Sequence, residues 1–149
     1  MAATPNSIIT PQTPYFGVVS LANAAACATR LPTAIASMTT GNGFYPFVST
    51  STNGRKVDYV QVKACSANIA SGSANQLVGA WVSDGTSGYL YKEIAVTSGS
   101  ASTTAASFDS GPVTLGLVLP TGYSVYASTT VATATGANAL SVFAWGADL

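Results

Sequence analysis

Few residues of this chain could do acid–base chemistry. The sequence has five acidic residues and no histidine, which removes the Ser-His-Asp and Cys-His mechanisms. Asp84 and Glu93 are the only acids near one expected hairpin, and a pair of carboxylates is what glycoside hydrolysis requires. Glu93, however, follows Lys92 and lies on the strand face opposite Ile94, as a solvent-facing or ion-paired acid would. Asp84 precedes a glycine and is typical of a turn closed by its side-chain oxygen. We therefore expect no enzymatic activity.

Metal, redox and nucleotide chemistry are equally poorly supported. The two cysteines, Cys27 and Cys65, cannot form a structural zinc site alone. We expect them to be buried small apolar residues rather than a disulfide, because one pair far apart in sequence is no framework. The glycine-rich stretch 111–122 lacks the lysine of a phosphate-binding loop. No cofactor and no metal are expected.

Charge is scarce throughout the chain. Only 7% of residues are charged, and five basic residues balance five acidic ones, whereas about a quarter of a soluble domain is ordinarily charged. The densest basic cluster is the pair Arg55 and Lys56, too little to displace counterions from phosphates, so nucleic acid is excluded as the main partner. No run approaches the ~20 apolar residues of a membrane span. The segment 16–29 has no basic leader before it, so we expect synthesis in a cytoplasm without a signal peptide.

The elements that position these residues read as short strands between Gly, Asn, Ser and Pro. Alternation is clearest at 113–119, where Val113, Leu115, Leu117 and Leu119 share one face, and at 57–66, where Val60, Val62 and Ala64 do. Residues 31–40 come nearest to a helix but are too short. Two Asn-Gly pairs, at 42–43 and 53–54, indicate tight turns. The strands expected lie at 15–21, 24–29, 43–50, 57–66, 77–84, 89–96, 113–119, 123–129 and 139–146.

This spacing predicts an all-β fold, an antiparallel β-sandwich of about eight strands formed by a single domain at 15–149. Residues 1–14 contain three prolines and no charge, which predicts an extended N-terminal arm. Such an arm is most easily ordered on its own domain or on a neighbour. Its apolar and proline residues are the expected protein-interface anchors: Pro5, Ile8, Ile9, Pro11, Pro14, Tyr15 and Phe16.

The surface itself is the strongest functional signal. Strand faces of Thr, Ser, Ala and Gly lose little rotamer entropy when covered and carry little desolvation cost compared with Lys or Glu. Protein interfaces are depleted of charge at their centres, so we interpret this surface as an interface. Six aromatic residues could alternatively form a sugar-stacking platform, although core or subunit contacts are favoured: Trp81, Tyr89, Tyr91, Tyr123, Tyr126 and Trp145.

Four stretches of the chain form an ordered set of turn and strand motifs. They are NGRKVDYVQVKA (53–64), VSDGTSGYLYKEIAV (82–96), LVLPTGYSVYAST (117–129) and FAWGADL (143–149). In this order they resemble small β-sandwich proteins of tailed bacteriophage particles across roughly 43–149. The chain departs from that family's pattern by inserting Lys56 before Val57 and by having Gly-Ala-Asp in place of Gly-Gly-Asp near the end.

The resemblance implies a jelly-roll-like decoration, or cement, protein on the outer surface of a phage capsid. Such proteins clamp neighbouring shell subunits, usually as trimers and often with an N-terminal arm. The expected partners are therefore copies of the chain itself in a homotrimer and the major capsid protein, and the expected location is the virion. Two alternatives stay open: a tail- or fibre-associated protein, and a carbohydrate-binding sandwich module of the virion.

Overall fold

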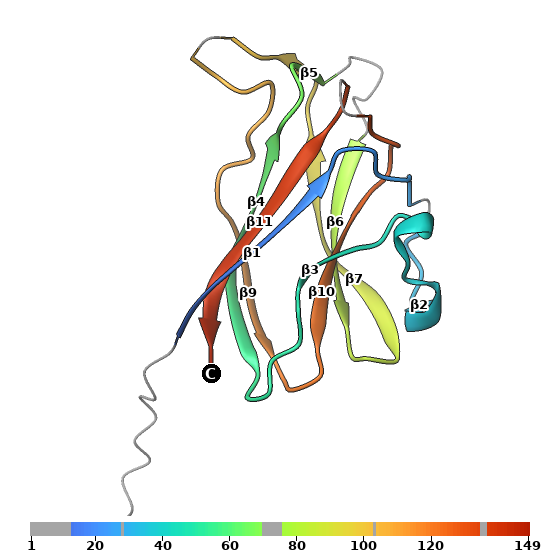
Figure 1. Cartoon of the computed structure of the whole chain (residues 1–149), viewed down its shortest axis with the longest axis vertical. Helices are drawn as coiled ribbons and strands as arrows, with labels where there is room; N and C mark the ends of the chain where they lie inside the picture. The colour runs from blue at the N-terminus through green and yellow to red at the C-terminus, as the bar shows by residue number, and fades with distance from the viewer. Residues whose placement is uncertain (1–12, 28, 70–75, 103, 135–136) are drawn as a thin grey trace, which may run out of the picture.

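The protein is a sandwich of two antiparallel sheets (Figure 1). The computed structural model describes residues 13–27, 29–69, 76–102, 104–134 and 137–149. The four-stranded sheet has the order β1-β11-β4-β9 and the five-stranded sheet the order β2-β7-β6-β10-β3, with a small β5-β8 ladder at one end. The strands are β1 (Thr13–Leu21), β2 (Thr33–Ala34), β3 (Tyr45–Val48), β4 (Arg55–Ala64), β5 (Asn68–Ile69), β6 (Gln76–Ser83), β7 (Ser87–Val96), β8 (Gly99–Ser100), β9 (Val113–Leu119), β10 (Ser124–Thr129) and β11 (Leu140–Asp148).

The connectivity is that of a jelly roll. The main strands in chain order are β1, β3, β4, β6, β7, β9, β10 and β11. The four-stranded sheet therefore takes the first, eighth, third and sixth strands, and the other sheet takes the second, seventh, fourth and fifth. This interleaving of two sheets is the arrangement by which a jelly roll folds. The predicted antiparallel, jelly-roll-like sandwich of about eight strands is confirmed.

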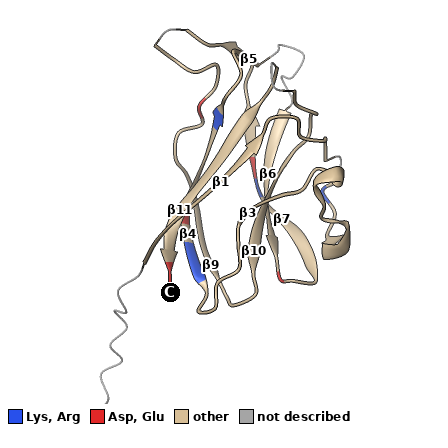
Figure 2. Ribbon diagram, viewed as in Figure 1, with Lys and Arg blue, Asp and Glu red and all other residues tan. Residues whose placement is uncertain are grey.

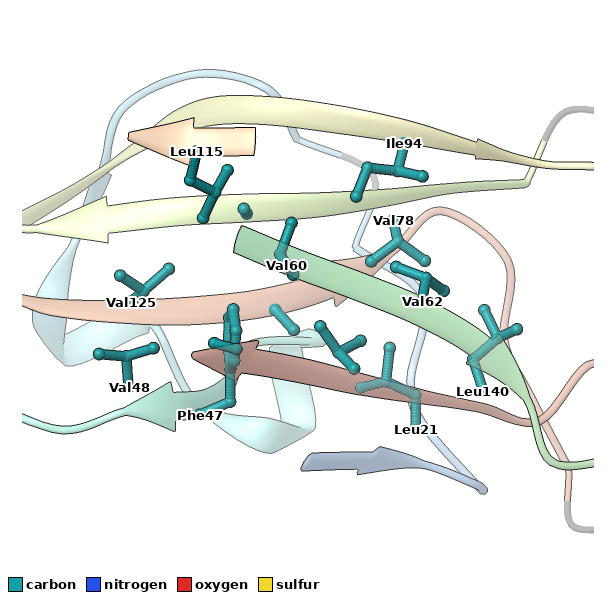
Figure 3. Packing of buried hydrophobic residues seen from close by; sticks show 14 of the residues in the cluster. Leu21, Phe47, Val48, Val60, Val62, Val78, Ile94, Leu115, Val125 and Leu140 are labelled. Atoms are coloured by element: carbon teal, nitrogen blue, oxygen red, sulfur yellow. The ribbon is translucent and has the colours of Figure 1, made fainter. Parts of the chain in front are cut away.

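The core lies between the sheets and consists almost entirely of aliphatic side chains (Figure 3). In β4, Val60 and Val62 point inward, while Tyr59 and Lys63 point outward. The predicted inward face of β9 is also confirmed, since Leu115 and the other inward residues of that strand all belong to the core or pack against it. The period-two pattern thus separates an apolar interior from two outer faces, whose chemistry decides what the molecule can bind.

One predicted strand is wrong. The stretch 24–29 was expected to be a strand, but among its described residues the backbone joins no ladder. Its amides form isolated hydrogen bonds instead: Ala24 N donates to Thr133 Oγ1 at 2.8 Å, and Cys27 N donates to the Thr129 carbonyl at 2.8 Å. Beyond it, the stretch that came nearest to a helix forms β2 and two single 3₁₀ turns, Ile35–Ser37 and Thr40–Asn42. The segment 22–44 is therefore an irregular cover over a sheet face.

The N-terminal boundary lies two residues earlier than the sequence suggested. Thr13 and Pro14, assigned to the arm, are the first residues of β1, where they pair with Asp148 and Ala147 of β11. The anchor residues Pro5, Ile8, Ile9 and Pro11 lie outside the described residues. The two Asn-Gly turns form as predicted, with φ of +83° at Gly43 and +89° at Gly54.

Candidate functional site

The outer face of the four-stranded sheet carries a continuous row of aromatic and aliphatic side chains. Phe16 of β1 lies opposite Trp145 of β11, which lies opposite Tyr59 of β4. In the next row Val18 lies opposite Phe143. The rings of Phe16 and Phe143 are 6.1 Å apart between centroids, and those of Tyr59 and Trp145 are 5.8 Å apart. We call these five residues the open face: Phe16, Val18, Tyr59, Phe143 and Trp145.

The open face is exposed to solvent. Phe16 is 61% exposed, Val18 54% and Tyr59 40%, while Phe143 and Trp145 are half-buried. Isolated exposed hydrophobic residues are ordinary on a protein surface. Here, however, three adjacent strands place aromatic rings side by side, and a contiguous apolar patch of this kind marks an interaction site. Because the rings stand on a rigid sheet, they lose little conformational freedom when a partner covers them.

Charged side chains border the open face without entering its centre. Figure 2 shows the charged residues of the four-stranded sheet toward the two ends of β4 and at the end of β11. Along β4, Lys56 pairs with Asp58 at 2.8 Å on one side of Tyr59, and on the other side Lys63 lies 3.9 Å from Asp109. An apolar centre with a polar rim is the anatomy of protein–protein interfaces.

The other sheet carries a comparable aromatic group that the chain covers itself. Trp81 of β6 meets Phe44 edge-on with centroids 5.0 Å apart, and its Nε1 donates to Ser128 Oγ at 2.8 Å. Met38 lies so close to β7 that a Cβ added at Gly88 would be 2.1 Å from the Met38 sulfur. We call this group the covered cluster. It consists of the buried residues Cys27, Met38, Phe44 and Trp81, with Ile35, Leu90 and Tyr126 packed against them.

The cover is the segment 22–44, drawn in blue and cyan beside the five-stranded sheet in Figure 1. Ile35 N donates to the Thr86 carbonyl at 2.8 Å, and Arg30 Nε pairs with Glu93 Oε1 at 2.7 Å. Both contacts fasten the segment to β7 or its preceding turn. The covered cluster is thus a buried satellite core, while the open face has no equivalent cover among the described residues.

Of the predicted anchors, Phe16 belongs to the open face and Tyr15 does not. The Tyr15 hydroxyl turns inward and donates to the Phe47 carbonyl at 3.1 Å. The Arg55 guanidinium carbon lies 3.6 Å from the centroid of the Tyr15 ring, and Arg55 Nε pairs with Asp148 Oδ1 at 2.5 Å. Arg55 itself is 7% exposed. This network fixes the end of the sandwich at which β1 begins, so Tyr15 is held by contacts within the chain whereas Phe16 is exposed.

The candidate catalytic acids have structural partners. Glu93 is paired with Arg30, as a surface acid was expected to be. The Asp84 carboxylate accepts hydrogen bonds at 2.8 Å from the amides of Thr86 and Ser87, and these bonds lower the pKa of Asp84. The predicted side-chain-closed turn is therefore confirmed. Within the described ranges, no three acidic, cysteine or histidine side chains gather as metal ligands do.

The cysteines differ in their surroundings. Cys27 is buried in the covered cluster, and burial raises the pKa of its thiol. Cys65 is exposed, so the prediction that both would be buried is wrong for this residue. It directly follows β4, and the alternation that turns Tyr59 and Lys63 outward places Cys65 on the same outer side. Both thiols are free.

The sequence alone did not predict that the residues of the open face lie side by side. Of the six aromatic residues considered as a platform, Trp81 and Tyr126 belong to the covered cluster, Tyr123 packs against the main core, and Tyr89 and Tyr91 stand on β7. Trp145 alone belongs to the open face. Alternation did indicate that Tyr59 points outward, but only the strand order places it beside Trp145 and Phe16.

Comparisons of the chain with protein-family models, with curated proteins and with solved structures found no match. Among the described residues, no helix has the length and apolar character needed to cross a membrane. The open face is accordingly the feature from which a function can be argued.

Proposed function

We propose that the chain is a structural protein of a bacteriophage particle, which decorates and stabilises the head shell by associating with its own copies and with the major capsid protein. The jelly-roll fold supports this proposal because it is one of the architectures from which virion proteins are built. The order of the four stretches that resemble phage β-sandwich proteins also supports it. The homotrimeric state and the capsid-surface location belong to the same proposal.

The open face is the observation that carries the proposal. Aromatic rings in the centre and ion pairs at the margin match the composition of protein interfaces, in which aromatic residues are enriched and charged ones depleted. The segment 22–44 covers the outer face of the five-stranded sheet, whereas no described residue covers the open face. We interpret this difference as an interface for other subunits of an assembly. In a free monomer the open face would cost solubility, since the net charge is zero.

A sugar-binding role is the second candidate, and one observation favours it. Tyr59 and Trp145 stand next to each other on an exposed sheet surface, as aromatic residues that stack on sugar rings do. Sugar recognition also needs converging hydrogen-bonding groups. The polar side chain beside these rings, Gln61, donates its Nε2 to Asp109 at 2.7 Å. The structural role therefore has the better support.

The experiment is to count copies of the protein in purified particles from its source by quantitative mass spectrometry. We expect many copies in a simple ratio to the major shell protein. A handful of copies would move the protein to the tail or fibre, and its absence from particles would refute the virion role. In that last case, a glycan array with the isolated protein would test the sugar-binding candidate.

A further inference from the structure

The free edges of the sandwich are built against strand pairing. Unpaired sheet edges invite other strands, and proteins block them with prolines, bulges and short strands. The edge strands β1 and β3 contain Pro14 and Pro46. The edge strand β9 contains Gly116 at φ +63°, where the register with β4 shifts between Val57 and Tyr59, as at a bulge. The last edge consists of the two-residue β2 and, beyond it, of β7 from Tyr89 to Val96, where the charged side chains of Lys92 and Glu93 disfavour strand addition. Association is therefore directed to a sheet face, and the open face is the one that no described residue covers.

The molecule itself shows what kind of segment covers such a face. Over the covered cluster lies an irregular stretch of Ala, Thr, Ser, Asn and Pro that presents a few large apolar side chains, Ile35, Met38 and Phe44, to the rings beneath. The first twelve residues, MAATPNSIITPQ, have the same chemistry. They are uncharged, rich in Ala, Thr and Pro, and carry Ile8 and Ile9 in the middle. They match the open face in lacking charge and in offering branched apolar side chains to its aromatic rings.

The segment joins the sandwich at the margin of the four-stranded sheet. Thr13 and Pro14 pair with β11 and are exposed, so β1 runs as a strand to this margin. Thr13 precedes a proline, which favours its extended backbone. Twelve residues can span up to about 40 Å when extended, whereas the nine residues of β1 span roughly 30 Å. The segment is thus long enough to cross the sheet of a neighbouring molecule.

We propose that residues 1–12 of one copy cover the open face of a second copy, with Ile8 and Ile9 packed on the rings of Phe16, Phe143 and Trp145. Residues 1–12 thus bury the aromatic side chains of a neighbouring copy, as the segment 22–44 buries those of the covered cluster within its own copy. This inference rests on the proposed structural role and names the partner at the open face. It makes the N-terminal segment the device by which copies associate.

The test uses the full chain and two complementary variants in solution. The arm variant carries Ile8→Ser and Ile9→Ser, and a deletion of residues 2–12 serves as its stronger form. The face variant carries Phe16→Thr, Val18→Thr and Tyr59→Thr, because threonine keeps strand propensity at exposed positions. The control variant carries Leu31→Thr and Tyr89→Thr, which removes exposed apolar side chains that lie outside the open face. Circular dichroism establishes that each variant is folded.

Light scattering gives the mass of each species. We expect the full chain and the control to be oligomeric, the arm and face variants to be monomeric, and an equimolar mixture of the deletion and the face variant to form dimers. That mixture holds one intact arm and one intact face, on different chains. If the mixture does not associate, or if the deletion keeps the full mass, the proposal is overturned.

Iodide quenching distinguishes exchange from an arm folded onto its own sheet. Of the two tryptophans, Trp81 is 1% exposed, so quenching reports on Trp145. We expect the deletion to increase quenching together with the loss of oligomers. A full chain that is monomeric, whether or not its arm shields Trp145, overturns the proposal. Counting copies in particles tests the virion role separately, because that count does not depend on which surfaces the copies use.

Discussion

The two outer faces of the sandwich carry aromatic groups of similar chemistry, and the described residues cover only one of them. On the five-stranded sheet, Trp81 and Phe44 are buried under the segment 22–44. On the four-stranded sheet, Phe16 and Tyr59 stand in solvent. The segment 22–44 completes the fold on the first face, and no described residue covers the second.

The largest difference between the two faces should be seen in stability. We expect Phe44→Ala to lower the free energy of unfolding by about 3–5 kcal/mol, because Phe44 is 2% exposed and its loss leaves a cavity beside Trp81. Phe16→Ala should cost less than about 1 kcal/mol, since Phe16 loses one ring contact, with Phe143, on an exposed sheet surface. Urea denaturation of both variants measures the difference.

This measurement should be made on the chain without residues 2–12, so that association does not add to the stability of the open face. Equal losses for Phe44→Ala and Phe16→Ala would show that the open face is part of the folded core. A loss below about 1 kcal/mol for both would show that the covered cluster is not packed as the structure has it.

The contrast between the faces also shows which structural features can be predicted from the sequence. The alternation of Val60 and Val62 with Tyr59 is local, so the sequence predicts both the strand and its outward residue. The neighbours of Tyr59 depend on β11 lying between β1 and β4, and strand order is set by pairings between distant segments that no local pattern records. The jelly-roll topology could therefore be suggested by resemblance, but the set of neighbouring residues that forms the open face could not be predicted.

The stretch 24–29 failed prediction for a different reason. Its small uncharged residues allow a strand, but the amides of Cys27 and Ala24 bond to the Thr129 carbonyl and to the side chain of Thr133 instead of to a ladder. Those partners come from the far end of the chain, so tertiary contacts override the local pattern here. Cys65 is a different case, because the alternation that turns Lys63 outward also turns Cys65 outward, and its exposure could have been predicted.

The reactivities of the two cysteines provide a second way to compare the covered cluster with the exposed surface. Cys27 lies in the covered cluster, and the raised pKa of its thiol reduces the reactive thiolate, whereas Cys65 is exposed. We expect a maleimide reagent to label Cys65 rapidly in the native protein and to label Cys27 only as fast as the covered cluster opens. Mass spectrometry of the labelled chain follows both sites.

The control for this prediction is Cys65→Ser. The native variant should remain unlabelled, and the denatured variant should take one label. Rapid labelling of Cys27 in the native control would contradict the buried covered cluster.

The smallest expected effect is on the stability of the fold at low pH. It can be tested with one carboxylate on each side of the molecule. Asp84 closes the turn between β6 and β7, which carry the covered cluster, and hydrogen bonds from the amides of Ser87 and Thr86 lower its pKa. Asp109 borders the open face, and its pKa is lowered first by the hydrogen bond from Gln61, then by the Gly111 amide and by Lys63.

A carboxyl whose pKa is lower in the folded than in the unfolded state binds fewer protons when folded, so stability rises with pH. Each aspartate therefore contributes fully above the ordinary pKa of about 4 and loses its contribution as the pH falls through the folded value. We expect the urea midpoint to be flat near neutral pH and to decline below about pH 5. Asp84→Asn keeps an oxygen that can accept both amide bonds, so it should remove part of the decline without unfolding the turn.

Asp109→Asn should remove a further part of the decline, and the double variant should combine the two losses because the residues stabilise different elements. Both groups are solvent-accessible, so each share is small beside the effect of Phe44→Ala. A decline unchanged in the double variant would place the acid sensitivity elsewhere. If only Asp84→Asn flattens the dependence of the urea midpoint on pH, the acid-sensitive step is the opening of the β6–β7 turn beside the covered cluster. In that case the hydrogen bond from Gln61 to Asp109, at the margin of the open face, is not required to keep the free molecule folded.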